Sequence, residues 1–270
     1  RAKPVDGGFR FTGRWSFSSG CDHATWVFVG GLVLGDDGAP VDYRTFLVPR
    51  ADYTIDDVWD TVGLRGTGSN DIVVDDVFVP EHHTLSFTDM ARCQCPGQEV
   101  NHGPLYRLPF GSIFTYTITT PIIGMAAGAY EAHVEHQRER IRVYGNEKAK
   151  DDPFGKVRIA TAASDIDAAW LQLSHNIGEE YALATAGAKI PMSLRLRVRR
   201  DQVLATGRAI AAVDLLFENS GGRALKVGTP IQRFWRDAHA GRVHAANDPE
   251  RALKMFGDGE FGDKVADAML

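Results

Sequence analysis

The chain has 270 residues, of which 44% are hydrophobic and 24% charged, with a formal net charge of −5 and a sequence pI of about 6.0. These values are typical of a globular protein with one large or two modest domains. The acidic balance argues against a nucleic-acid binder, which needs a basic surface, and no apolar run approaches the roughly 20 residues that cross a bilayer. Small molecules and protein partners remain open.

The three cysteines, Cys21, Cys93 and Cys95, form an odd and sparse set, which is typical of a reduced, cytoplasmic protein. Cys93 and Cys95 lack a second cysteine pair to complete a zinc site, so we expect no metal. The sequence begins at Arg1 with neither an initiator methionine nor the apolar core of a signal peptide. We therefore expect a fragment whose beginning is missing.

Residues 8–80 carry the signals of short strands separated by turns. Apolar and polar residues alternate, β-branched and aromatic residues are frequent, and turn clusters such as Gly35-Asp-Asp-Gly38 intervene. Strands are expected at 9–15, 26–34, 45–49, 53–59 and 71–80. The pattern predicts an antiparallel sheet folded as a sandwich or small barrel.

A connector rich in proline and glycine at 81–109 separates these strands from long helical patterns. Apolar or small residues recur at intervals of three and four over 156–188, and further helices are expected at 122–144, 191–217 and 230–248. Short connections between long helices favour an up-down four-helix bundle. The predicted fold is therefore α+β, with a β-domain and its connector at 1–103 and a helical bundle with its tail at 104–270.

Helix ends are marked by residues that satisfy free backbone groups. Asp152-Pro153 and Thr229-Pro230 are typical helix starts, because the polar side chain can cap N–H groups and proline suits the first position. Gly221 and Gly222, after Ser220, are a natural helix end. The arginine-rich run 195–200 is interpreted as a solvated face or a subunit contact.

The run Gly13-Arg-Trp-Ser-Phe-Ser-Ser-Gly20 places serines and Trp15 at the end of a strand. Hydroxyl groups there could hydrogen-bond a flavin ring nitrogen, and an aromatic side chain could cover the ring. Serines before a turn more often satisfy turn backbone, and composition alone favours that reading. The run Gly63-Leu-Arg-Gly-Thr-Gly-Ser-Asn70 is no dinucleotide fingerprint, because a strand follows its glycines, and it predicts a tight turn.

Two histidines lie on the helix expected at 230–248. His239 and His244 are five residues apart, which puts them on different faces, so they cannot chelate one metal ion as an i,i+4 pair would. One of them is expected to face a cavity. A lone histidine on such a helix is more often a core residue than a catalytic one.

Several long stretches together resemble the acyl-CoA dehydrogenase superfamily, and within it the flavin-dependent monooxygenase branch. These stretches are Trp15-Ser-Phe-Ser-Ser-Gly-Cys-Asp-His23, Gly63-Leu-Arg-Gly-Thr-Gly-Ser-Asn70, Val74-Asp-Asp-Val-Phe-Val-Pro80, Glu147-Lys-Ala-Lys-Asp-Asp-Pro-Phe154 and Phe234-Trp-Arg-Asp-Ala-His-Ala-Gly-Arg-Val-His-Ala-Ala-Asn-Asp-Pro-Glu-Arg251. The resemblance covers nearly the whole chain. It is strongest to oxygenase components that hydroxylate a phenolic seco-steroid in steroid and cholesterol degradation.

Two departures from the dehydrogenases favour the monooxygenase branch. The position that matches their catalytic glutamate is Ala245, whose methyl group cannot abstract a proton. Ahead of Phe154-Gly155, where they carry an arginine for the FAD pyrophosphate, this chain has Asp151, which would repel an anion. The resemblance therefore implies reduced FMN (FMNH2), with FAD as the alternative, and O2 as co-substrate.

The resemblance also implies residue roles. His244 would act as the base that enriches the phenolate, or would stabilise the flavin hydroperoxide, and Ser19, with Ser18 as second choice, would hydrogen-bond the flavin near N5. Val243 and Trp15 are expected to contact the flavin. Gly221 and Gly222 match a backbone flavin contact donated across a subunit boundary, and Arg140 could bind a phosphate or be a solvated helix charge.

The implied partners are a separate NADH-dependent flavin reductase, the phenolic seco-steroid and further copies of the chain in a homotetramer. The helical domain that begins proteins of this family has no counterpart in the 270 residues, and it normally lines the substrate pocket. Three alternatives follow from the residues: a hydroxylase of a simpler phenol on the same fold, an acyl-CoA dehydrogenase, and an inactive oligomerising fragment.

Overall fold

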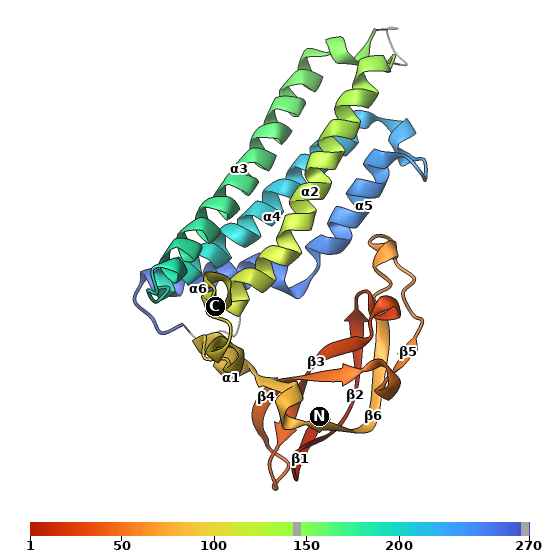
Figure 1. Ribbon diagram of the computed structural model, residues 1–270. Coiled ribbons are helices and arrows are strands. Elements are labelled where there is room, and N and C mark those ends of the chain that lie inside the picture. Colours follow the sequence, from red (N-terminus) through yellow and green to blue (C-terminus); the bar gives the residue numbers. More distant parts are fainter. Residues whose placement is uncertain (143–146, 266–269) are drawn as a thin grey trace. The chain divides into compact units, whose positions relative to one another are not determined.

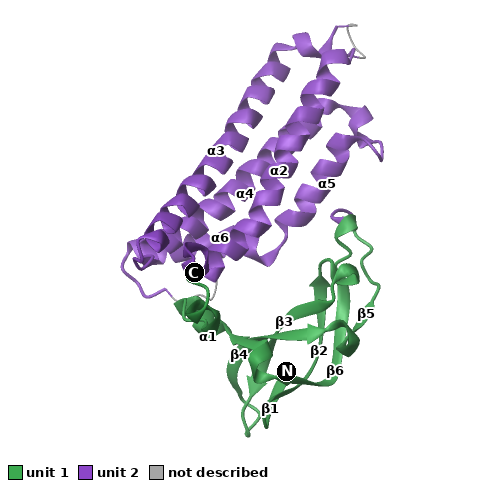
Figure 2. Cartoon of the chain, viewed as in Figure 1, with its two compact units in different colours: residues 1–61, 65–102 green, residues 62–64, 103–270 purple. Residues whose placement is uncertain are grey.

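The computed structural model describes residues 1–142, 147–265 and 270, and they form two compact units. Figure 2 shows the unit of residues 1–61 and 65–102 in green and the unit of residues 62–64 and 103–270 in purple. The division after His102 lies one residue from the expected one. The segment Val62–Leu64 belongs to the helical unit, although strands precede and follow it.

The first unit is built on one seven-stranded sheet (Figure 1). Its strands are β1 (Ala2–Val5), β2 (Gly8–Ser18), β3 (Trp26–Leu34), β4 (Pro40–Pro49), β5 (Thr54–Asp56), β6 (Asn70–Pro80) and β7 (Thr84–Ser86). Their order across the sheet is β5-β6-β2-β1-β3-β4-β7. All pairs are antiparallel except β1 with β3, which pair in parallel where Ala2 faces Val33, so the sheet is mixed.

The sheet buries one face around aromatic side chains. Phe11 and Phe46 are fully buried and stack with ring centroids 4.1 Å apart, and Phe9 meets Phe46 edge-on at 5.5 Å. Alternation of buried and exposed residues along β3 follows from the period of two in a strand. The sequence pattern did not reveal β1 and β7, because they are only four and three residues long. Helix α1 (Phe87–Arg92) follows β7.

The second unit is a bundle of helices that lie side by side in Figure 1. The helices are α2 (Phe110–Glu139), α3 (Pro153–Thr185), α4 (Met192–Ser220), α5 (Pro230–Arg242) and α6 (Pro249–Glu260). Helices α2 to α5 form the expected bundle, and α6 packs against α4. Helix α2 begins twelve residues before the expected start at 122, so Pro121 lies inside it. The expected end at residue 144 falls outside the described residues.

The predicted helix ends are largely confirmed. The side chain of Asp152 accepts a hydrogen bond from the backbone N–H of Phe154 at 3.1 Å, as a cap does. Gly221 ends α4 with φ of 70°, a conformation that favours glycine. The predicted cap at Thr229 is wrong, because its hydroxyl donates to the carbonyl of Ala224 at 3.0 Å, while Pro230 does begin α5.

Helix α2 is long and apolar enough, by length and composition alone, to cross a membrane. It also packs against α3, α4 and α5, and its buried residues include Ile122, Ala126 and Ala129 at 0–1% exposure. The core helix of a bundle has the same composition as a membrane span, because both are surrounded by apolar groups. In this bundle, α2 contributes to the core.

The interpretation of 195–200 as a solvated face is wrong for two of its arginines. Arg195 and Arg199 are buried, with 9% and 3% exposure, and Arg199 donates to the carbonyl of Ala246 at 3.0 Å. The run lies on α4, the helix with the most buried residues, so every third or fourth position faces the core. Composition alone could not separate these inward positions from the outward ones.

Glu180 of α3 is a fully buried carboxyl group. Its Oε1 accepts a hydrogen bond from the hydroxyl of Ser112 at 2.9 Å. Burial raises the pKa of Glu180 to about 7, while the bond from Ser112 and the charges of Arg195 and Arg197 act in the opposite sense. The bundle therefore contains an acid that titrates near neutral pH.

We predict that Glu180 makes the bundle less stable as the pH rises. A carboxyl group whose pKa is higher in the folded than in the unfolded state loses its stabilising contribution as the pH rises through the folded value. Between about pH 4.5 and 7.5 the free energy of unfolding should fall in the wild type, relative to Glu180→Gln, by on the order of 3 kcal/mol. Urea unfolding across that range measures it, and parallel profiles for the two proteins would contradict the prediction.

Candidate functional site

The serine-rich end of β2 docks on the loop before β6, within the first unit. The hydroxyls of Ser19 and Ser69 are 2.8 Å apart, and the N–H of Gly20 donates to the carbonyl of Thr67 at 2.8 Å. Ser69 is buried and also bonds the hydroxyl of Thr67. The two glycine- and serine-rich runs that the sequence analysis singled out are therefore joined into one polar surface by hydroxyl contacts.

Trp15 is engaged inside the sheet domain, whereas Phe17 points outward. The indole N–H of Trp15 donates to the carbonyl of Gly30 at 2.7 Å, and its ring lies 4.9 Å from that of Phe11. Phe17 has a φ of 63°, is 75% exposed and lies 6.1 Å from the ring of Trp59. A left-handed conformation is costly for an aromatic residue and is concentrated at functional sites. The alternation of polar and apolar residues in Ser16-Phe-Ser18 gives no sequence signal of this left-handed conformation.

The turn after α5 carries Val243 and His244. The prediction that His244 lies on a helix is wrong, because α5 ends at Arg242 and His244 has extended backbone angles before the 3₁₀ turn Ala245–Asn247. Val243 is 82% exposed, and His244 is exposed as well. His239 remains on α5, where it donates to the carbonyl of Trp235 and lies 3.2 Å from Asp214 of α4. Its contacts are those of a packing residue.

The backbone fixes which nitrogen of His244 carries the proton. Its Nδ1 accepts the N–H of Ala246 at 3.1 Å. A backbone N–H can only donate, so in neutral His244 the proton is on Nε2. The ring lies 6.0 Å from that of Phe114 of α2. Although the residue as a whole is exposed, desolvation of its ring by such neighbours lowers the pKa of His244. At neutral pH the turn therefore presents a neutral imidazole with an N–H donor.

Asn247, which closes this turn, is fully buried and tied to three helices. Its Oδ1 accepts from Nε2 of Gln202 on α4 at 2.8 Å and from the hydroxyl of Thr119 on α2 at 3.3 Å. Its Nδ2 donates to the carbonyl of Gly241 on α5 at 2.9 Å, and its own carbonyl accepts from Arg242 at 2.8 Å. The position of the His244 turn is thus set by the bundle core.

The Arg-Asp pair of α5 holds the segment Val62–Leu64. Arg236 donates to the carbonyl of Val62 at 2.7 Å, and Oδ1 of Asp237 accepts the N–H of Leu64 at 2.7 Å. Gly63 has no room for a side chain, since a Cβ there would lie 2.3 Å from the carbonyl oxygen of Arg236. The motif that contributed to the family resemblance therefore has a structural role on this side of α5.

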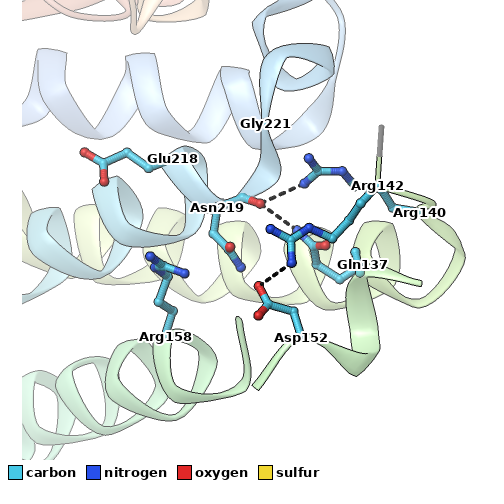
Figure 3. A pocket seen from close by; sticks show the side chains of 9 residues that line it. Gln137, Arg140, Arg142, Asp152, Arg158, Glu218, Asn219 and Gly221 are labelled. Atoms are coloured by element: carbon cyan, nitrogen blue, oxygen red, sulfur yellow. Dashed lines mark hydrogen bonds and ion pairs between the residues drawn. The ribbon is translucent and has the colours of Figure 1, made fainter. Parts of the chain in front are cut away.

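An arginine-lined pocket of about 290 Å³ lies where α2, α3 and α4 end or begin (Figure 3). The described residues that line it are Gln137, Arg140, Arg142, Ala149, Asp152, Arg158, Glu218, Asn219 and Gly221. Three guanidinium groups outnumber the two carboxylates, and Arg142 pairs with Asp152 at 3.4 Å. Such a pocket suits an anionic ligand, because arginine presents several N–H donors to phosphate oxygens.

Arg140 and Gly221 both line this pocket. Arg140 donates to the carbonyl of Asn219 at 2.8 Å, and a Cβ at Gly221 would lie 2.3 Å from Nη2 of Arg140. Gly222 begins the next 3₁₀ turn, and a Cβ there would meet no atom within 4 Å. Glycine is therefore needed at 221 for close approach, and the chain fits a phosphate at this point.

Asp151, the residue expected to repel an anion, is not among the described residues that line this pocket. Asp151 is exposed at the end of a short 3₁₀ turn, whereas Asp152 caps α3 and pairs with Arg142. The expected repulsion of an anion by Asp151 therefore stays a prediction. Among the described residues, no group of three or more histidine, cysteine or acidic side chains could hold a metal ion.

Comparisons with known proteins place these features in one family. Residues 116–249 match the family described as acyl-CoA dehydrogenase, C-terminal domain. The chain is 63% identical over 267 residues to the flavin-dependent monooxygenase, oxygenase subunit HsaA, of Rhodococcus jostii, covering 98% of this chain and 70% of that protein. It is 61% identical to the protein of the same name from Mycobacterium tuberculosis, covering 98% and 68%.

A solved structure agrees with the sequence comparison. The crystal structure of 3-HSA hydroxylase from Rhodococcus sp. RHA1 superposes with a TM-score of 0.95 at 62% identity, over 100% of this chain and 69% of that one. The predicted α+β fold and the predicted family are thereby confirmed. The chain belongs to the oxygenase subunits of the flavin-dependent monooxygenases, which have the acyl-CoA dehydrogenase fold.

Proposed function

We propose that the chain is the oxygenase component of a two-component enzyme that hydroxylates a phenolic seco-steroid, ortho to its hydroxyl group, to a catechol. The observation that supports this proposal is the turn of His244, which presents a neutral N–H donor one residue before Ala245, the position that matches the carboxylate base of the dehydrogenases. The names of two relatives more than 60% identical, a flavin-dependent monooxygenase and a 3-HSA hydroxylase, support it. The site would act in steroid and cholesterol degradation.

His244 acts in this proposal as a hydrogen-bond donor. In the neutral ring Nδ1 is occupied by the N–H of Ala246, and Nε2 already carries a proton, so neither nitrogen is a ready base. Nε2–H can instead donate to oxygen in the reaction, either on the phenol or on the flavin side. Preorganised donors of this kind lower a barrier because they need no reorientation as charge develops.

Each unit, taken by itself, contains candidate flavin contacts in this proposal. Ser19, with Ser18 beside it, would hydrogen-bond the ring near N5, and the exposed Phe17 offers an aromatic face that Trp15, packed in the sheet domain, does not. Arg140, Gly221 and the neighbouring arginines would bind a phosphate, with Gly221 and Gly222 serving the flavin of a neighbouring subunit. Reduced flavin and O2 supply the hydroxyl group.

The oxygenase requires partners to receive reduced flavin. The relatives are named oxygenase subunits, which supports a separate reductase, and we propose that it uses NADH. We also propose that the flavin is FMN, that the chain assembles as a homotetramer and that it works in the cytoplasm. Size-exclusion chromatography with light scattering tests the tetramer.

We predict that His244→Ala lowers the rate of hydroxylation by roughly 100- to 1000-fold, as expected for one lost donor, while the dissociation constant of reduced flavin changes little. His239→Ala is the matched control, because it removes an imidazole of α5 whose polar contacts are the carbonyl of Trp235 and the carboxylate of Asp214. Single-turnover product formation measures the rate. Protonation of Nδ1 breaks its bond with the N–H of Ala246 and so releases the ring from this position. Because burial lowers the pKa of His244, the acid limb of the wild-type profile should lie below about pH 6.5. An unchanged rate in His244→Ala would remove the residue from the mechanism.

We predict that Arg140→Ala weakens the binding of reduced FMN about tenfold, by loss of a charge-assisted hydrogen bond to phosphate. Arg138→Ala, an exposed arginine two residues earlier on α2, should leave it unchanged. Anaerobic titration measures both, and the same titration with reduced FAD ranks the two flavins. Tighter binding of FAD would replace FMN in the proposal.

The decisive experiment mixes the anaerobic complex with reduced FMN rapidly with O2. We expect an oxygenated flavin absorbance that decays faster when a phenolic seco-steroid is present, together with formation of a catechol. Equal acceleration by a simple phenol would favour the simpler substrate. Immediate appearance of oxidised flavin and peroxide would favour an inactive fragment, and bleaching of FAD by an acyl-CoA without reductase would favour a dehydrogenase.

A further inference from the structure

A buried histidine of α2 lies behind the arginine-lined pocket. His133 is 0% exposed; its Nδ1 is 2.8 Å from the hydroxyl of Ser220, and its Nε2 is 3.2 Å from the side-chain amide of Asn219. Both partners belong to the last turn of α4, which leads into Gly221. His133 therefore connects the last turns of α2 to the end of α4, where Asn219 and Gly221 line the pocket.

The hydrogen bonds determine the form of the His133 ring. The hydroxyl of Ser220 donates its single proton to the carbonyl of Leu216 at 2.8 Å, so it must accept from Nδ1 of His133. Nε2 is then unprotonated and accepts from Nδ2 of Asn219. Burial, followed by the charges of His136 and Arg140, lowers the pKa of His133 to about 4. The ring is neutral at physiological pH, with its proton on Nδ1.

Asn219, which is labelled in Figure 3, contacts both His133 and the residues of the pocket. While its side chain is held by His133, its backbone carbonyl accepts from Nη1 of Arg140 at 2.8 Å and from Nε2 of Gln137 at 2.9 Å. The guanidinium group of Arg140 is thus oriented by a carbonyl whose own position depends on the imidazole. A side chain held in this way loses little further freedom when it binds an anion.

We infer that His133 is a positioning residue of the arginine-lined pocket: through Asn219 it fixes Arg140 and the Gly221 turn, and so sets the affinity for the phosphate monoester of the flavin. The inference rests on the proposed function of the pocket. It adds to that proposal a residue that does not contact the ligand. The imidazole acts by accepting one hydrogen bond from Asn219 and donating another to Ser220.

Two near-isosteric variants separate the two hydrogen bonds of His133. In His133→Asn the side-chain amide nitrogen takes the position of Nδ1 and can still donate to Ser220. The asparagine side chain is too short to reach the position of Nε2, so the hydrogen bond from Asn219 is lost. Glutamine places an amide oxygen near Nε2, so His133→Gln keeps that acceptor. His175→Asn, on an exposed position of α3, is the control for the substitution itself.

The measurement is anaerobic titration of the full chain with reduced FMN and with reduced riboflavin, which lacks the phosphate. We expect His133→Asn to lose about tenfold in affinity for FMN, the effect of about one hydrogen bond, and none for riboflavin. His133→Gln should stay close to wild type. The double variant with Asn219→Ala should lose no more than either single variant, because both remove the same contact.

The outcomes distinguish the role of His133 from the binding of a flavin phosphate in the pocket. Equal wild-type affinity for the two flavins would overturn the phosphate assignment and this inference with it. A wild-type preference for FMN that His133→Asn retains would overturn the role of His133 alone. Loss of affinity for both flavins in parallel would indicate a merely structural role. Nitrogen chemical shifts of His133 should show the Nδ1–H tautomer at pH 7, and the Nε2–H tautomer would also overturn it.

Discussion

The hydrogen bonds of one buried amide, that of Asn247, determine where the candidate catalytic turn lies. Asn247 has no exposed surface, and its side chain connects α2, α4 and the end of α5. Burying an amide is costly unless its donors and acceptors are satisfied, so this arrangement tolerates few alternatives. His244, three residues earlier, inherits its position from that constraint rather than from contacts of its own.

Two other polar clusters cross the apolar core of the bundle in the same manner. Ser112 of α2 bonds Glu180 of α3, and His133 of α2 bonds Ser220 of α4. Helix α2 takes part in all three clusters, which explains why its sequence mixes threonine, serine and histidine with apolar residues. Directional bonds of this kind specify the register of neighbouring helices, which apolar packing alone leaves more open.

Periodicity and capping residues predicted most of the fold. The strand at 26–34 matches β3, and Asp152-Pro153 begins α3 as expected. The first half of α2 was missed because its hydroxyl residues face inward, toward Glu180 and Gln202, and so interrupt the apolar period. The end of α5 was missed for a related reason, since the turn at His244 is stabilised by contacts with Thr119 and Gln202, far away in sequence. Long-range polar contacts of this kind leave no local signal.

The hydrogen bond that holds Nδ1 of His244 comes from the main chain. It needs only the backbone N–H of residue 246, which proline alone lacks, while the burial of Ala246 restricts that position to a small side chain. The tautomer of His244 is therefore determined by the position of a backbone N–H and does not depend on which side chain residue 246 carries. A substitution that changes a side chain beside the imidazole therefore leaves this bond, and the direction of the Nε2–H, in place.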